Sequence, residues 1–309
     1  MKYLNLIRYQ NLVLIAFMQL IFRFGFLKYQ NIYLFLSNAQ YLLLVLATVL
    51  IAAAGYIIND ILDQDTDHIN KPERVYIGKG ISEAMGYNLY FLLNVAGVGI
   101  GFYLSNVIQK PTFGGIFIII VTLLYMYATT LKQMLLIGNL AVAFILSCSI
   151  LIIGVYDLLP LTFESNRAQM GIIFSLLLDY AIFAFALNFM REVVKDMEDI
   201  EGDKSEDMNT LAIALGIKKT SKLVFGLGIV AILTLLWYIN TYLMANQLYY
   251  ATLYGLIFVV SPMIFFVVKM WTASTSKEFH FLSTLLKWVI LFGIVSSAVI
   301  TFNLMHHAK

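Results

Sequence analysis

Nine long apolar runs constrain this 309-residue chain more than any other feature of its sequence. Each run has about 18 residues or more, which is enough to cross the hydrocarbon core of a bilayer as a helix. The runs cover residues 10–27, 40–59, 86–108, 112–131, 135–157, 169–190, 222–245, 249–268 and 282–304. Because a helix satisfies its own backbone hydrogen bonds in lipid and an open sheet does not, they predict an all-α, polytopic membrane bundle.

The composition agrees, since 61% of the residues are hydrophobic and only 12% are charged. A soluble domain of this length needs a more polar surface. The first run is not followed by a small-residue cleavage site, so we expect it to be retained as the first helix. No linker rich in Pro, Gly or Ser and no low-complexity tract interrupts the chain, which predicts one transmembrane domain over residues 1–309. A lone cysteine, Cys148, excludes a disulfide framework and a cysteine-based zinc site.

The distribution of Lys and Arg predicts how the bundle sits in the membrane. With nine spans the loops alternate between two sides, and the side of the N-terminus receives 14 of these residues. The other side receives five, namely Arg23, Lys28, Lys110, Arg167 and Lys309. Cytoplasmic loops carry an excess of positive charge. We therefore expect a multi-pass protein of the cell (inner) membrane with a cytoplasmic N-terminus and its C-terminus outside.

Acidic residues gather in two segments on the cytoplasmic side. Twelve of the 18 Asp and Glu residues lie within residues 60–67 and 192–207, directly after the second and sixth apolar runs. In each segment three aspartates share the spacing i, i+3 and i+7: Asp60, Asp63 and Asp67, then Asp196, Asp199 and Asp203. If each segment continues its preceding helix, this spacing places three carboxylates on one helical face. The sequence therefore predicts two acidic faces that look into one cavity.

The two aspartate triplets have the chemistry of a magnesium or calcium site rather than a zinc site, because the repeated positions carry only carboxylates and no His or Cys. Magnesium commonly binds one or two carboxylates, several waters and the phosphate oxygens of a substrate. Facing carboxylates also repel one another unless cations lie nearby. Two triplets therefore indicate a diphosphate held between two magnesium sites. Residues on the same side of the membrane fit such a ligand: Arg8, Asn11, Arg74, Lys132, Arg191 and Lys195.

Each of these residues also has a purely structural interpretation. A single aspartate in a membrane loop is usually solvated. A lysine that follows an apolar helix, such as Lys132, is commonly only an anchor, and Tyr125 and Tyr127 are more often interfacial than functional. The repeated spacing of the two triplets favours the functional interpretation for the aspartates. Aromatic side chains would in addition suit a cavity that holds an isoprenoid tail or an allylic cation.

Three segments resemble motifs of the UbiA superfamily of intramembrane prenyltransferases. NDILDQDTDHINKPER, residues 59–74, resembles the family's NDxxDxxxD motif and the N-x-P-x-R that follows it. REVVKDMEDIEGDKSEDMNTLAI, residues 191–213, resembles the second aspartate-rich motif, and YATTLKQMLLIGN, residues 127–139, resembles the stretch between them. The resemblance covers nearly the whole chain. It implies a nine-helix bundle with a cavity in the membrane, capped by the loops between helices two and three and between six and seven, and Mg²⁺-dependent transfer of a prenyl group from a polyprenyl diphosphate.

The resemblance also implies roles for individual residues. Metal ions and diphosphate would be bound by two sets: Asn59, Asp60, Asp63 and Asp67, and Asp196, Asp199 and Asp203. Arg74 and Lys132 match basic positions that contact the diphosphate and Tyr127 an aromatic position near the cation, so these three are the expected catalytic residues. Arg8 and Asn11 resemble the family's R-P-x-N start, although Tyr9 replaces the proline. The expected substrate-binding residues are Arg8, Asn11, Asn59, Arg74, Lys132, Arg191 and Lys195.

The acceptor has two interpretations. REVVKDMEDIEGDK most resembles the archaeal-type digeranylgeranylglyceryl phosphate synthases, which implies a geranylgeranyl diphosphate donor and a geranylgeranylglyceryl phosphate acceptor. A KDxxDxEGD pattern also occurs among homogentisate prenyltransferases, and the menaquinone enzymes share a shorter DIEGD. An aromatic prenyltransferase of quinone biosynthesis, acting on a hydroxynaphthoate or homogentisate, is therefore the alternative. The expected partners are the donor, a lipid-soluble acceptor and the bilayer, without nucleic acid and without an obligate protein partner.

An ion-coupled transporter stays the remote alternative, because transporters also place carboxylates in membrane cavities. Their carboxylates usually lie near the bilayer midplane on broken helices. The aspartate triplets instead follow the ends of apolar runs, which favours the enzyme.

Asp179 lies about 12 residues before the cytoplasmic end of the sixth helix, which places it near the bilayer midplane. A carboxylate there is costly unless it is paired, protonated or facing a cavity. It either bonds to a neighbouring helix or faces the lower cavity and limits which prenyl tail or acceptor can enter.

Overall fold

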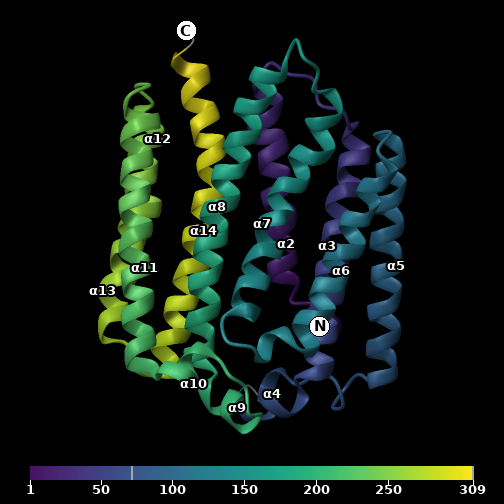
Figure 1. Ribbon diagram of the computed structural model, residues 1–309, viewed down its shortest axis with the longest axis vertical. Coiled ribbons are helices and arrows are strands. Elements are labelled where there is room, and N and C mark those ends of the chain that lie inside the picture. The colour runs from purple at the N-terminus through teal and green to yellow at the C-terminus, as the bar shows by residue number, and fades with distance from the viewer. Residues whose placement is uncertain (71, 308–309) are drawn as a thin grey trace.

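The computed structural model describes residues 1–70 and 72–307, with the side chains of Arg74 and His307 outside that description. Within this part, nine helical segments are long and apolar enough to cross a membrane (Figure 1). They are Tyr9–Tyr29, Asn38–Leu62, Glu83–Val107, Pro111–Thr129, Ile137–Leu161, Arg167–Glu198, Ile217–Met244, Tyr249–Thr272 and Ser276–His306. Each coincides with one of the nine apolar runs, which confirms the predicted all-α membrane bundle.

Several spans consist of more than one helical element. The principal helices are α2 (Tyr9–Leu20), α3 (Asn38–Leu62), α5 (Glu83–Val107), α6 (Gly114–Thr129), α7 (Ile137–Asp157), α8 (Arg167–Glu198), α11 (Ile217–Tyr238), α12 (Tyr249–Tyr254), α13 (Ser261–Thr272) and α14 (Ser276–His307). Wide or tight turns extend them at η1 (Ile21–Phe26), η2 (Leu27–Tyr29), η4 (Pro111–Phe113), η6 (Leu159–Leu161), η7 (Ile239–Met244) and η8 (Gly255–Val260). Short helices connect them: α1 (Lys2–Leu6), α4 (Gln64–Asn70), η3 (Pro72–Arg74), η5 (Leu131–Gln133), α9 (Ile200–Ser205) and α10 (Leu211–Leu215).

The helices pack around two main apolar clusters that share α8 and α14. One cluster joins residues of α2, α3, α5, α6, α7, α8 and α14, and the other joins residues of α8, α11, α13 and α14. The short helices α4, α9 and α10 lie together at one end of the bundle, and α4 contacts α9 (Figure 1). The connections after α3 and after α8 thus form a cap over that end.

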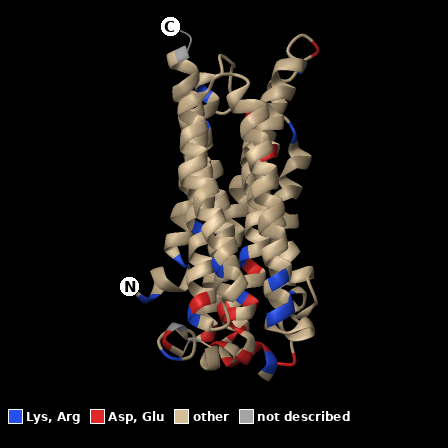
Figure 2. Ribbon diagram, turned by 90° about the vertical axis from the view of Figure 1, so that its left-hand side faces the viewer, with Lys and Arg blue, Asp and Glu red and all other residues tan. Residues whose placement is uncertain are grey.

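Acidic residues gather at the capped end of the bundle, together with Lys and Arg residues (Figure 2). The opposite end is much poorer in charge (Figure 2). Arg23 was counted above among the charges of the outer loops, but it lies in η1 inside the first span and is only 2% exposed. Its guanidinium pairs with the buried carboxylate of Asp157, so Arg23 is a packing residue of the membrane interior rather than a loop charge.

The two aspartate segments are not continuous helices, and the expectation that each triplet lies on the face of one helix is wrong. α3 ends at Leu62 and α8 ends at Glu198, so both breaks fall at the middle aspartate of a triplet. Asp63 has φ −99° and ψ 13°, and Asp199 has φ −100° and ψ 11°. This sparsely populated backbone region is common at active sites. The third aspartate of each triplet therefore comes from a separate short helix, α4 or α9.

Candidate active site

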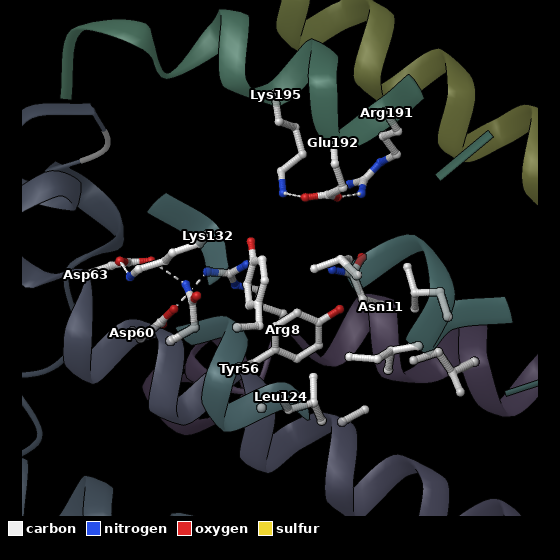
Figure 3. Close-up of a pocket in the computed structure, with 18 of the residues that line it drawn as sticks. Arg8, Asn11, Tyr56, Asp60, Asp63, Leu124, Lys132, Arg191, Glu192 and Lys195 are labelled. Carbon is white, nitrogen blue, oxygen red and sulfur yellow. Dashed lines mark hydrogen bonds and ion pairs between the residues drawn. The ribbon is translucent and has the colours of Figure 1, made fainter. Parts of the chain in front are cut away.

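A cavity of about 740 Å³ lies at the capped end of the bundle and extends between its helices (Figure 3). All six aspartates of the two triplets line it, namely Asp60, Asp63, Asp67, Asp196, Asp199 and Asp203. Deeper in the bundle its walls are apolar and come from α2, α3, α6 and α7, with Ile15, Ile51, Leu124, Ile145 and Ile152. A polar mouth above apolar walls suits an amphiphilic ligand with an anionic head and a hydrocarbon tail.

The depth of the cavity follows from the helices that line it. Thr48 lines its floor on α3 and lies twelve residues before Asp60 at its mouth. At a rise of 1.5 Å per residue this corresponds to about 18 Å. Behind the floor, the buried amide of Gln19 donates hydrogen bonds to Thr48 Oγ1 (3.2 Å) and to the carbonyl of Ser149 (2.9 Å). These contacts tie α2, α3 and α7 together below the cavity.

Two ion pairs organise the first aspartate segment (Figure 3). Arg8 Nη2 lies 2.8 Å from Asp60 Oδ1, and Lys132 Nζ from η5 contacts Asp63 Oδ1. The side-chain amide of Asn59 donates to Asp63 Oδ2 at 2.5 Å. Burial disfavours the charged form of Arg8, but the Asp60 carboxylate outweighs this, so the pKa of the guanidinium lies above its ordinary value. Residues far apart in the sequence thus meet at the mouth of the cavity.

Asn70 joins the two aspartate segments. Its side-chain amide donates to the backbone carbonyl of Asp199 (3.0 Å), and its amide oxygen accepts from the backbone N–H of Gly202 (2.9 Å). A Cβ atom on Gly202 would lie 2.3 Å from Asn70 Nδ2, a distance that no side chain can occupy. The asparagine of the first motif and the glycine of the second are therefore explained by one close contact between α4 and α9.

The second aspartate segment has different neighbours. Asn139, near the start of α7, donates its side-chain amide to Asp196 Oδ2 at 2.9 Å. Glu192 is buried and accepts from two cations, Arg191 Nη1 at 3.1 Å and Lys195 Nζ at 2.9 Å (Figure 3). On α14, Lys287 Nζ donates to Asn11 Oδ1 at 2.7 Å. All of these residues except Asn139 line the same cavity.

The donor set at the mouth fits magnesium bound together with a diphosphate. No three acidic, His or Cys side chains in the described part of the chain converge closely enough to hold a metal by themselves. Magnesium ordinarily takes one or two carboxylates and completes its shell with water and phosphate oxygens. In addition, Asn59 Oδ1 lines the mouth, is buried, and has no hydrogen-bond partner among the described residues. This oxygen offers a ligand to a cation or to the water of its shell.

The structure brings together nearly all the residues that the sequence singles out. Tyr127, Lys132, Arg8, Asn11, Asn59, Arg191 and Lys195 line the cavity together with the six aspartates. The side chain of Arg74 lies outside the described residues. The sequence interpretation missed Tyr56, Asn70, Asn139 and Lys287, which also line the cavity or tie its segments together. Asn139 closes the quoted YATTLKQMLLIGN stretch, and Lys287 is the single charged residue of the ninth apolar run, so both had a signal in the sequence.

Asp179 is not among the described residues that line this cavity. It is exposed on the surface of α8, and its carboxylate accepts a hydrogen bond from Tyr238 of α11. Of the two interpretations of this aspartate, the geometry therefore favours the bond to a neighbouring helix. Such a bond reduces the cost of a polar group within an apolar span.

Comparison with known proteins identifies the family to which this chain belongs. Residues 20–302 match the model of the UbiA prenyltransferase family. The chain is 30% identical over 271 residues to digeranylgeranylglyceryl phosphate synthase of Methanosphaera stadtmanae, covering 85% of this chain and 88% of that protein. A solved structure of a digeranylgeranylglyceryl phosphate synthase superposes with a TM-score of 0.61 at 25% identity, over 96% of this chain and 98% of the other.

A more distant solved structure has the same fold. It is a UbiA homolog from Archaeoglobus fulgidus bound to DMAPP and Mg²⁺, with a TM-score of 0.58 at 14% identity, over 96% of this chain and 99% of the other. The family match covers most of the sequence, both structures superpose over nearly its whole length, and the motif residues meet in one cavity. This chain is therefore a multi-pass membrane protein that belongs to the UbiA prenyltransferase family.

Proposed function

We propose that this protein transfers a geranylgeranyl group from geranylgeranyl diphosphate to geranylgeranylglyceryl phosphate, with magnesium, and releases diphosphate. The observation that carries the proposal is the single cavity in which two aspartate segments and several cations meet above apolar walls. The relatives named digeranylgeranylglyceryl phosphate synthase support the choice of donor and acceptor. Since α8 contributes to both apolar clusters, we further propose that residues 1–309 act as one transmembrane domain.

The roles of the residues follow from electrostatics. The two aspartate triplets would hold magnesium, which when bound neutralises the charge of the diphosphate leaving group. Arg8, Arg74 and Lys132 stabilise the negative charge that grows on the departing diphosphate as its bond to the prenyl carbon breaks. Tyr127, at the mouth, faces the region where the allylic cation forms. A hydroxyl oxygen of the acceptor then forms the new bond to that carbon and gives up its proton.

The apolar walls have two tasks in this scheme. They accommodate the prenyl chain, and they exclude the water that would otherwise capture the cation. An extended chain of four isoprene units is on the order of 20 Å long, which matches a wall about 18 Å deep from mouth to floor. At that end of the wall Gln19 is hydrogen-bonded to Thr48 and Ser149. The length of the cavity is therefore consistent with a C20 donor.

The direct test is turnover by the purified protein in lipid nanodiscs, supplied with labelled geranylgeranyl diphosphate, Mg²⁺ and a panel of acceptors. We expect diphosphate release and a labelled lipid product with geranylgeranylglyceryl phosphate, and no product with homogentisate or a hydroxynaphthoate. Product formation with only an aromatic acceptor would overturn the proposed acceptor. Failure to release diphosphate with any acceptor would overturn the enzyme itself and leave the transporter.

We also propose that the capped end faces the cytoplasm, because the Lys and Arg excess lies on that side. In a Cys148→Ser background, a cysteine at exposed Ser82 or Ser205 is expected to resist impermeant thiol reagents in intact cells. A cysteine at exposed Ser165, which lies between α7 and α8 at the other end, is the matched control and should be labelled. Labelling of both capped-end positions with protection of Ser165→Cys would reverse the orientation.

A further inference from the structure

Two groups of cations reach the cavity from different helices. Arg8 and Lys132 lie beside Asp60 and Asp63 at the first aspartate segment, whereas Arg191 and Lys195 project from α8 on the other side of the cavity (Figure 3). Lys287 from α14 lines the cavity as well, and its charge interacts with that of Arg191. We call Arg191, Lys195 and Lys287 the α8–α14 basic group.

The two groups differ in how their charge is balanced. Arg8 is paired with Asp60 and Lys132 with Asp63, so each cation of the first group has its own carboxylate. In the α8–α14 basic group, Arg191 and Lys195 share the single carboxylate of Glu192. The hydrogen bond that Lys287 makes goes to the neutral amide of Asn11. The three cations of this group therefore have one carboxylate, that of Glu192, as their ion-pair partner, which leaves positive charge available to an anion.

Unused hydrogen-bonding capacity points in the same direction. Arg191 Nε is buried and has no hydrogen-bond partner among the described residues. A buried donor without a partner costs free energy, so such groups usually have a ligand or water in the working protein. Arginine forks match phosphate oxygens especially well, and a lysine adds a compact point charge. Arg191 and Lys287 together offer both kinds of phosphate contact.

The position of Lys287 within an apolar run argues against a purely structural role, because burying a charge there costs free energy. It lies five residues into the apolar run 282–304, which is about 8 Å at 1.5 Å per residue. A lysine at such depth within a membrane span is costly unless it faces a cavity or a counter-charge. It is only partly buried and lines the cavity, so an anion can reach it from the mouth.

We propose that the α8–α14 basic group binds the phosphate of the acceptor, while the two aspartate segments with Arg8 and Lys132 bind the diphosphate of the donor. This inference rests on the proposed function and assigns the part of the site that selects the acceptor. A phosphate monoester carries a charge near −2 at neutral pH and presents three acceptor oxygens. A neutral glycerol lipid does not offer this contact. Lys287 and Arg191 therefore determine specificity for a phosphate-bearing acceptor.

The substitution Lys287→Met tests this, because it removes the charge and keeps most of the side-chain volume. Kinetics are measured with geranylgeranylglyceryl phosphate and with geranylgeranylglycerol, which lacks the phosphate, and with the donor varied separately. We expect the KM for the phosphate acceptor to rise about 10- to 100-fold, as for loss of a charged hydrogen bond. The KM for the neutral acceptor and the KM for the donor should change less than about twofold. Lys287→Arg, the matched control, should keep most of the preference for the phosphate.

Each other outcome overturns the inference. A rise in the KM for the donor would assign Lys287 to the diphosphate, and an equal loss with both acceptors would assign it a structural role. If Lys287→Met does not fold, Arg191→Gln carries the same test, because Glu192 keeps Lys195 as its partner. A wild-type enzyme that ignores geranylgeranylglyceryl phosphate but prenylates an aromatic acceptor would instead refute the proposed function. The two failures are therefore distinguishable.

Discussion

Replacing Asp63 or Asp199 with alanine is expected to reduce kcat about 100- to 1,000-fold without preventing folding. These are the aspartates at which α3 and α8 end, and both line the cavity. Each removes a carboxylate from the set proposed to hold magnesium against the diphosphate. Chelation of Mg²⁺ with EDTA should produce a loss of at least the same size in the wild-type protein, and added Mg²⁺ should reverse it.

Neighbouring acidic residues provide matched controls for this experiment. Asp65 and Glu201 lie two residues after Asp63 and Asp199, are exposed, and are absent from the described lining of the cavity. Asp65→Ala and Glu201→Ala change the same net charge and should keep near-normal rates. If Asp63→Ala and Asp199→Ala both turn over at rates close to those of their controls, the model of two magnesium sites is wrong.

The Mg²⁺ dependence of the rate distinguishes loss of a metal ligand from a general loss of structure in these variants. In Asp63→Ala the cavity also loses the partner of Lys132, which leaves that lysine free to contact the diphosphate. We therefore expect the donor to remain bound while the Mg²⁺ concentration needed for half-maximal rate rises. Unchanged Mg²⁺ dependence in both variants would argue against their role as ligands.

The spans were predictable because hydropathy measures what the bilayer requires. Apolar runs of helix length predicted every membrane helix, but they end where charge begins rather than where the helix ends. The sixth run ends at residue 190, whereas α8 continues through Arg191, Glu192 and Lys195 to Glu198. A helix that leaves the lipid keeps its backbone hydrogen bonds and needs only a polar environment for its side chains. Hydropathy therefore missed the turns that carry the charged part of the site.

The site itself was predictable only in part. The repeated aspartate spacing indicated that two segments would meet, and they do. Neither Gly nor Pro stands at the helix breaks at Asp63 and Asp199. The local sequence therefore did not predict that the helices end there. The contacts of Asn70 with Gly202 and of Lys287 with Asn11 join residues separated by 132 and 276 positions. Such pairs are set by how the helices pack, which local patterns do not record, although a lone lysine in an apolar run signals function.

The largest effect on stability is expected at the opposite end of the bundle, from replacing Asp157 with alanine. Arg23 and Asp157 are 2% and 0% exposed, and Arg23 Nη1 lies 2.7 Å from Asp157 Oδ2. The backbone N–H of Leu36 donates to Asp157 Oδ1 at 3.0 Å, and the carbonyl of Leu36 accepts from the guanidinium. The guanidinium also lies over the ring of Tyr41, 4.3 Å from its centroid. This cluster ties η1, the connection before α3 and the end of α7 together.

Breaking a buried pair by removing one partner typically costs about 3–5 kcal/mol, because the remaining charge stays in apolar surroundings without compensation. Asp157→Ala should therefore lower the free energy of unfolding by about that amount, measured by thermal or denaturant unfolding in detergent micelles. The double variant Arg23→Met with Asp157→Leu removes both charges and fills the space they leave. It retains only the cost of the unpaired Leu36 backbone groups, about 1–3 kcal/mol each, and should be more stable than Asp157→Ala alone.

This comparison distinguishes electrostatic compensation from simple packing. If the pair stabilised the bundle mainly by filling volume, the double variant and Asp157→Ala would differ in stability only because Asp157→Ala leaves a cavity. Asp157→Asn settles this point, because it keeps the volume and an acceptor for Leu36 but leaves the Arg23 charge unpaired. We expect Asp157→Asn to be less stable than the double variant, because removing one partner of a buried ion pair is strongly destabilising, whereas replacing the whole pair with apolar side chains of similar volume is often neutral. The reverse order would mean that the ion pair contributes little beyond its shape. Turnover by the folded fraction should stay near normal in all three variants, because neither Arg23 nor Asp157 lines the described cavity.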